Sequence, residues 1–323
     1  MSLLLGSVCV ELLQARQDTI YMSVPNSHKH RLGAQDNPSV GLFVSTDGGT
    51  TWEHKGWRGY IRTFYTEEGS DGTLWSACGN GVLRSTDCGN SWRITTGWQI
   101  TEVLKIKVDA LKPAVVYAAT AYGVFKTENG GETWQERNKG FLKPFVSDIV
   151  IDRFHSNKLL ATSEDGVYVS TNGGTGWRRV GIESKGVRTI VQHPVVKDLF
   201  FAGTEDNGVF VSRDGGKRWS ATNSGLEHLT VYSIACDRSN PDILYVGTHG
   251  GGVYRSSDGG RSWHQKTEGL SNLVIHCLVV LPSNPSVLFA GTLNGGLFKS
   301  SDGGEHWSFN SQEEAQVWAL WAK

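Results

Sequence analysis

Two pairs of adjacent acidic residues are the first groups in this chain that could do chemistry. They are Glu164 with Asp165, and Glu205 with Asp206. Carboxyl groups held close together can serve as a general acid and a general base. Tight turns are also rich in acidic residues, so their position in the fold must separate a catalytic role from a structural one.

A basic stretch is the second candidate. Residues 25–41, PNSHKHRLGAQDNPSVG, contain His28, Lys29, His30 and Arg31 in succession. Cationic side chains can bind an anionic ligand, and imidazoles can bind zinc or copper. A loop of this length is functional or simply mobile and solvated, and both interpretations stay open.

Seven near-copies of one turn motif show which elements position these residues. The copies are STDGGTTW (45–52), STDCGNSW (85–92), TENGGETW (127–134), STNGGTGW (170–177), SRDGGKRW (212–219), SSDGGRSW (256–263) and SSDGGEHW (300–307). The terminal tryptophans recur every 40 to 44 residues, which is the length of one four-stranded propeller blade. Each repeat also holds four β-rich runs between turn clusters, as in TVYSIACDR, ILYVGT, GVYRSS and the run after SSDGGRSW. The sequence predicts an all-β fold with one seven-bladed β-propeller domain over residues 1–323.

The repeated turn has a structural explanation. Its third residue is Asp or Asn, whose side-chain oxygen can accept backbone N–H groups of the same turn. Its fifth residue is glycine in all seven copies, which allows a positive φ. We expect the tryptophan to begin the fourth strand and to pack against the neighbouring sheet.

The motif S-x-D-x-G-x-[TS]-W resembles the Asp-box, or BNR, repeat. The repeats are similar to those of sialidases, xyloglucanases, sortilin-type receptors and photosystem II assembly factors. This resemblance implies that the motif joins the third and fourth strands on one face. It also implies that ligands meet the opposite face around the central channel. Because such relatives include hydrolases, receptors and assembly chaperones, the resemblance implies a fold and no single function.

A ring of side chains at the channel is predicted by aligning the first strands of the repeats. The second position of these strands holds Arg62, Leu104, Ser147, Arg188, Tyr232, His276 and, if the C-terminus supplies a strand, Trp318. Either EEAQVWALWAK at the C-terminus or SVCVELL near the N-terminus could be the innermost strand of the first blade, and we expect both ends to meet there. The candidate ligand-binding residues are therefore His28, His30, Arg31, Arg62, Arg188, Tyr232, His249, His276 and Trp318.

The composition argues against several partners. There are 31 basic and 32 acidic residues, so no global field favours nucleic acid or a membrane surface. The five cysteines are scattered without CxxC spacing, which favours reduced thiols and a cytoplasmic location. The N-terminal MSLLLGSVCVELL reads poorly as a signal peptide or a membrane span. We expect no metal, since the histidines lack ligand spacing, and no cofactor, since HGGG and similar stretches lack a following helix to hold phosphate.

Three functions remain to be compared. The favoured one is a non-catalytic propeller that binds a protein or a glycan on its loop-rich face. The alternative is a glycoside hydrolase of the sialidase or xyloglucanase type at the channel mouth. The sialidase version lacks an Arg-Ile-Pro motif and a third ring arginine, unless Arg31 or Arg58 supplies one, and the xyloglucanase version lacks a second propeller. The third is a metal-dependent enzyme using His28, His30, His249 and His276. The sequence assigns no catalytic residue and no oligomeric state.

Overall fold

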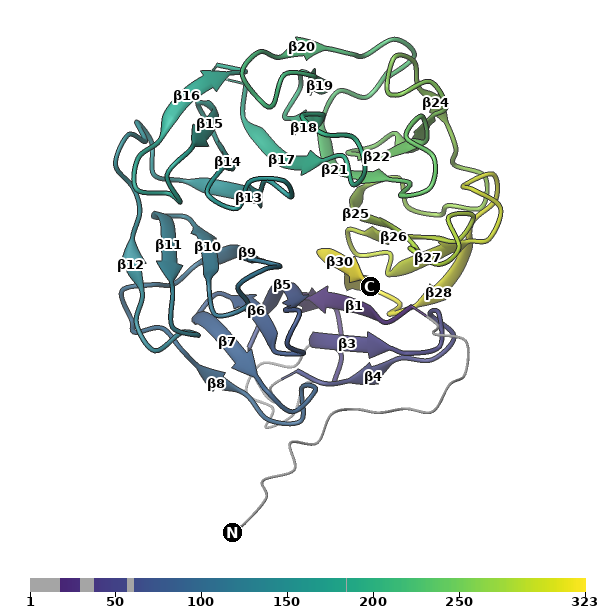
Figure 1. Ribbon diagram of the computed structural model, residues 1–323. Helices are drawn as coiled ribbons and strands as arrows, with labels where there is room; N and C mark the ends of the chain where they lie inside the picture. The colour runs from purple at the N-terminus through teal and green to yellow at the C-terminus, as the bar shows by residue number, and fades with distance from the viewer. Residues whose placement is uncertain (1–17, 30–37, 57–60, 184) are drawn as a thin grey trace.

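Seven four-stranded antiparallel sheets are arranged in a ring in the computed structural model (Figure 1). The structure describes residues 18–29, 38–56, 61–183 and 185–323. All regular elements in these ranges are strands, which confirms the predicted all-β class and the seven-bladed propeller. Within the same ranges there is no helix long and apolar enough to cross a membrane. The assignment of residues 1–323 to one domain stays a prediction.

Each blade has an innermost strand, A, followed outward by strands B, C and D. Blade 1 consists of β30 (Ala319–Ala322), β1 (Ile20–Val24), β3 (Gly41–Ser45) and β4 (Glu53–His54), and blade 2 of β5 (Thr63–Glu68), β6 (Leu74–Cys78), β7 (Gly81–Ser85) and β8 (Arg93–Ile94). Blade 3 consists of β9 (Val103–Val108), β10 (Val116–Thr120), β11 (Gly123–Thr127) and β12 (Gln135–Glu136), and blade 4 of β13 (Val146–Ile151), β14 (Leu159–Ser163), β15 (Gly166–Ser170) and β16 (Arg178–Gly181). Blade 5 consists of β17 (Val187–Gln192), β18 (Phe200–Thr204), β19 (Val209–Ser212) and β20 (Ser220–Ala221). Blade 6 consists of β21 (Val231–Cys236), β22 (Leu244–Thr248), β23 (Gly252–Ser256) and β24 (His264–Gln265), and blade 7 of β25 (Ile275–Val280), β26 (Leu288–Thr292), β27 (Leu297–Ser300) and β28 (Ser308–Ser311). A short two-stranded sheet pairs β2 (Asn26–Ser27) with β29 (Ala315–Gln316).

The C-terminus closes the ring. Strand β30 is the innermost strand of blade 1 and pairs with β1, with Ser23 opposite Ala319. The C-terminal segment therefore supplies strand A of this blade, as one of the two expected closures requires, while SVCVELL lies outside the described residues. The outer part of the closure is a hydrogen bond of 3.0 Å from Trp52 Nε1 in blade 1 to Asn310 Oδ1 in blade 7.

The hydrophobic cores lie between neighbouring blades. All residues of every B strand are buried, because each B strand is covered by adjacent blades on both faces of its sheet. Glycine allows the closest approach: a Cβ on Gly247 of β22 would stand 2.6 Å from Ile275 Cγ2 of the next blade. The blades are thus held by apolar packing around the whole ring.

The Asp-box turns fasten the outer strands as expected. In blade 6, Asp258 accepts the backbone N–H groups of Arg261 and Ser262, both at 2.9 Å, and Gly260 has φ 81°. Trp263 is buried, and its Nε1 donates to the Thr222 carbonyl at the end of blade 5 at 2.8 Å. These contacts stabilise the turn and join it to the preceding blade.

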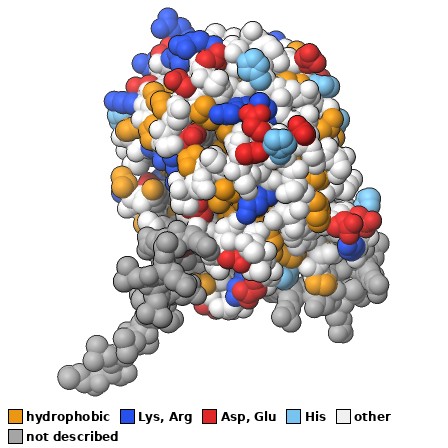
Figure 2. Space-filling view, turned by 90° about the vertical axis from the view of Figure 1, so that its right-hand side faces the viewer, with side chains coloured by type: hydrophobic (Ala, Val, Ile, Leu, Met, Phe, Trp, Pro, Cys, Tyr) orange, Lys and Arg blue, Asp and Glu red, His pale blue; other side chains and the backbone are white. Residues whose placement is uncertain are grey.

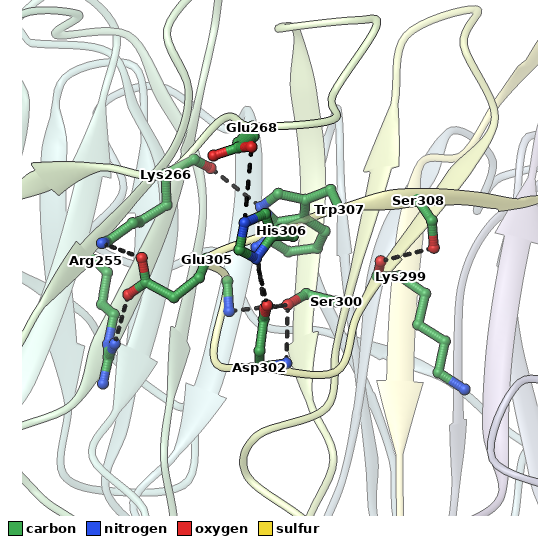
Figure 3. A network of polar contacts seen from close by, with 11 residues as sticks. Arg255, Lys266, Glu268, Lys299, Ser300, Asp302, Glu305, His306, Trp307 and Ser308 are labelled. Carbon is green, nitrogen blue, oxygen red and sulfur yellow. Dashed lines mark hydrogen bonds and ion pairs between the residues drawn. The ribbon is translucent and has the colours of Figure 1, made fainter.

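Blade 7 shows the same turn with an added ionic network (Figure 3). His306 Nδ1 lies 2.7 Å from Asp302 Oδ2, and Trp307 Nε1 donates to the Lys266 carbonyl of blade 6 at 3.1 Å. Glu305 forms ion pairs with Lys266 at 2.6 Å and with Arg255 at 3.3 Å, both in blade 6. On the side of the disc formed by blades 6 and 7, acidic and basic side chains lie next to one another (Figure 2).

The two faces of the disc are built from different loops. In blades 3 to 7 a glycine N–H of the Asp-box turn donates to the A–B loop of its own blade, as from Gly173 to the Asn157 carbonyl at 2.8 Å, so these two kinds of loop share one face. We call this the Asp-box face. The D–A and B–C loops form the opposite face, which we call the upper face.

Candidate functional site

A β-bulge recurs near the upper end of the inner strands. It follows the first residue of six consecutive A strands and leaves the second residue without a partner in strand B. A bulge re-aims the side chain of the extra residue. The bulged residues are Phe64, Leu104, Ser147, Arg188, Tyr232 and His276. Together with Trp318 they line a channel cavity of about 1170 Å³.

Four of these side chains form a continuous row of rings, which we call the aromatic arc. Phe64 and Trp318 have ring centroids 5.9 Å apart, and Trp318 and His276 have centroids 4.8 Å apart. His276 and Tyr232 stack at 5.0 Å with an interplanar angle of 16°. The arc crosses four blades, because its residues come from β5, β25, β21 and the residue that precedes β30. It gives the channel mouth a row of ring faces and edges for contact with apolar or aromatic groups.

The arc is uncharged near neutral pH. Burial, followed by the charge of His249, lowers the pKa of His276 to about 4. Burial raises the pKa of Tyr232, so its hydroxyl stays protonated. His249 also touches the arc, with its ring centroid 5.9 Å from that of Tyr232. His276 is therefore a neutral ring in this arc and not a cation.

Arg188 supplies a charge at the end of the arc. Its Nη2 lies 2.5 Å from Glu205 Oε2, and both side chains are partly exposed. Its Nε has no hydrogen-bond partner among the described residues. A ligand at this end of the arc therefore meets a partly exposed ion pair, whose guanidinium and carboxylate it can contact.

The expected position of Arg62 in the ring is wrong. Phe64 occupies it, and Arg62 lies two residues earlier with its side chain exposed. The reason is a shorter A–B hairpin in blade 2, where Glu68 pairs with Leu74, whereas Val108 pairs with Val116 in blade 3. An alignment that assumes equal hairpins shifts the inner strand by two residues.

The basic stretch does not meet the arc in the described residues. The backbone N–H of His28 donates to the Glu314 carbonyl at 3.1 Å, and Lys29 forms an exposed ion pair with Glu313 at 3.3 Å. His28 does not line the channel cavity. His30, Arg31 and Arg58 lie outside the described residues. The binding roles assigned to them, and to His28, stay predictions.

The paired acids each have a structural partner. Glu164 lies 3.8 Å from Lys143, and Asp165 Oδ2 accepts the Tyr168 hydroxyl at 2.7 Å. Asp206, in a turn with φ 63°, accepts the Thr230 hydroxyl at 2.6 Å, while Glu205 pairs with Arg188. Over the described ranges, no three His, Cys, Asp or Glu side chains come together in a way that could hold a metal ion.

The comparisons with known proteins agree with the fold. The BNR/Asp-box repeat model matches residues 43–54. A xyloglucanase from Paenibacillus sp. is 31% identical over 108 residues, which are 32% of this chain and 10% of that enzyme. A GH74 enzyme from Niastella koreensis superposes with a TM-score of 0.71 at 16% identity, over 90% of this chain and 54% of that one. YCF48 bound to D1 peptide superposes with a TM-score of 0.59 at 19% identity, over 85% of this chain and 91% of that one.

These likenesses support the seven-bladed propeller with BNR/Asp-box repeats. The chain spans about a tenth of the xyloglucanase and about half of the GH74 enzyme, whereas it spans most of the YCF48 chain. The similar structures thus include glycoside-hydrolase propellers and a propeller holding a peptide.

Proposed function

We propose that this chain is a non-catalytic propeller whose aromatic arc binds a segment of a partner protein. The observation that carries the proposal is the unbroken row of Phe64, Trp318, His276 and Tyr232 at the mouth of the cavity. Large rings that are held rigidly supply binding area at a low cost in conformational entropy. The protein would act as a platform, and its presence in the cytoplasm is part of the proposal.

A protein partner is favoured over a glycan by two features. YCF48, which superposes over 85% of this chain, was solved with a peptide bound. Arg188 at the end of the arc also offers a partly exposed guanidinium, which suits an acidic side chain of a partner. A glycan partner remains an outcome of the test below.

A display library of short peptides and a glycan array test the proposal in parallel. Wild-type protein should enrich peptides that the Trp318→Ala variant does not retain. The control is Trp98→Ala, because Trp98 is an 85% exposed tryptophan in the D–A connection of the same face and does not line the cavity. Binding of glycans alone would contradict the protein partner, and the absence of any peptide whose retention depends on Trp318 would contradict the site.

Hydrolysis is the second candidate, and the xyloglucanase similarity is the observation in its favour. The geometry counts against it, since the carboxyl groups of Glu164, Asp165, Glu205 and Asp206 are each held by a neighbouring side chain. Incubation with xyloglucan and measurement of new reducing ends decides between the two functions. We expect no release above a buffer control. Release that the Glu205→Gln variant abolishes would instead establish the hydrolase.

A further inference from the structure

Four neighbouring A–B loops on the Asp-box face are built on one plan. The first residue of each loop is buried and accepts the backbone N–H of the residue two positions later. These residues are Asp109, Asp152, His193 and Asp237, with distances of 2.9, 2.9, 3.3 and 2.7 Å. The A–B loops of blades 3 to 6 are therefore each held in a fixed conformation by a buried acceptor side chain.

The position fixed by this hydrogen bond displays large apolar side chains in three consecutive blades. Leu111 is 79% exposed, Phe154 is 47% exposed and Val195 is 54% exposed. We call these three residues the apolar strip. Because their backbone N–H groups are tied to buried acceptors, their exposure belongs to the ordered loop. Neighbouring exposed apolar side chains are typical of interaction surfaces.

Two arginines stand beside the strip, at the end of the channel. Arg153 precedes Phe154, and Arg238 holds the corresponding position in blade 6; both line the cavity. No ion pair joins either guanidinium to a described acid. Other basic groups of the cavity are paired, as Lys107 is with Glu67 at 3.0 Å.

The electrostatics of this pair favour an anion. Burial, followed by the charge of Arg153, lowers the pKa of Arg238, so the two like charges act on each other. The buried Asp18 also acts on Arg238, but its carboxylate accepts the Ser283 backbone N–H at 3.1 Å and the Ser283 hydroxyl at 2.6 Å. A carboxylate placed between the two guanidinium groups would offset their repulsion and accept charge-assisted hydrogen bonds.

The geometry points to a second docking surface on the Asp-box face: the apolar strip receives apolar side chains of a partner protein, and Arg153 and Arg238 bind an acidic side chain of the same segment. The occupant is a protein segment with both kinds of residue, because an isolated anion would leave the strip uncovered and a purely apolar segment would leave the arginines unpaired. This surface lies on the face opposite the aromatic arc, so it is independent of the proposed function.

Selection from a library of random short peptides tests this surface directly. The library is passed over wild-type protein and, in parallel, over an Arg153→Glu/Arg238→Glu variant. We expect peptides rich in both acidic and large apolar residues to be enriched on the wild type alone. If no peptide is enriched on the wild type alone, so that every enriched peptide also binds the arginine variant, the inference is overturned.

Calorimetric titration of one enriched peptide then separates the parts of the surface. The milder Arg153→Gln/Arg238→Gln variant should weaken binding at least about tenfold, and Phe154→Ser or Val195→Ser at least about fivefold. The matched control is Arg261→Gln, since Arg261 is an exposed arginine of the same face that does not line the cavity. The Trp318→Ala variant should also bind normally. Equal losses for Arg261→Gln, or loss with Trp318→Ala, would contradict the inference.

Discussion

His276 and Trp318 pack with their ring centroids 4.8 Å apart, although one belongs to blade 7 and the other leads into the strand that closes blade 1. Trp318 is placed by a backbone hydrogen bond of 2.9 Å from its N–H to the Ser23 carbonyl. The closure of the ring and the construction of the aromatic arc therefore depend on the same C-terminal segment.

Removal of residues 319–323 should destabilise the propeller strongly. The deletion removes β30, its pairing with β1 and the buried side chains of Leu320 and Ala322. We expect the melting temperature to fall by at least about 10 °C, which corresponds to several kcal/mol for a domain of this size. Lys323→Ala is the control: it removes only the ion pair with Glu68 and should leave thermal unfolding almost unchanged. An unchanged melting temperature for the deletion would contradict this closure.

The pH dependence of stability should report His276. Its pKa is about 4 in the folded protein and near 6.5 in the unfolded chain. Between these values the unfolded chain binds more protons, so lowering the pH from 6.5 to 4 destabilises the fold, by up to about 3 kcal/mol. Urea unfolding at a series of pH values should show a smaller loss for His276→Phe than for the wild type. Identical pH profiles would mean that the His276 pKa is not depressed.

The Asp-box carboxylate should stabilise its turn through hydrogen bonds. Asp258→Ala removes the acceptor of two backbone N–H groups and two hydroxyls, and we expect a loss of about 1–2 kcal/mol in the free energy of unfolding. Asp258→Asn should retain most of that stability, because Asn129 and Asn172 hold the same position in blades 3 and 4. Urea unfolding of the two variants measures the difference. A loss for Asp258→Asn as large as that for Asp258→Ala would show that the charge of the carboxylate, and not its hydrogen bonds, is the decisive property.

The tryptophan of the same motif should matter more than its carboxylate. Trp263 is 1% exposed and packs in the core between blades 5 and 6. Trp263→Ala should cost about 3–5 kcal/mol, since it removes a large buried ring. The exposed Trp98 provides the matched control, and Trp98→Ala should change the unfolding free energy by less than about 0.5 kcal/mol. Similar losses for the two variants would contradict the proposed structural role of the motif.

Much of the fold follows from the seven repeated turns, because each carries its own hydrogen-bonding acceptor, glycine and tryptophan. The same register placed Leu104, Ser147, Arg188, Tyr232 and His276 correctly at the second position of their strands. It misplaced Arg62 because the length of the A–B hairpin varies between blades, and no turn motif in the sequence specifies that length. If Thr63-Phe64-Tyr65 is aligned with Val231-Tyr232-Ser233, the sequence places Phe64 at the second position of its strand, where the structure has it.

The surface on the Asp-box face could not be found in the same way. Arg153 and Arg238 lie in A–B loops, whose sequences differ from blade to blade. The strand register does relate the two arginines, since each follows an Asp and lies six residues after the bulged residue of its strand, but it does not show their exposure or their lack of an ion pair. Pairing between side chains of different loops, and the lack of it, depends on three-dimensional positions that spacing does not specify.

The affinity of one peptide that wild-type protein enriches and Trp318→Ala does not retain, measured for the wild type and for the Trp318 variants, tests the central claim most directly. We expect Trp318→Ala to weaken binding at least about tenfold, which is about 1.4 kcal/mol, and Trp318→Phe to restore part of it. Trp98→Ala should bind as the wild type does. Equal affinities of the wild type and Trp318→Ala, in variants that unfold at the same temperature, would contradict a binding role for the aromatic arc.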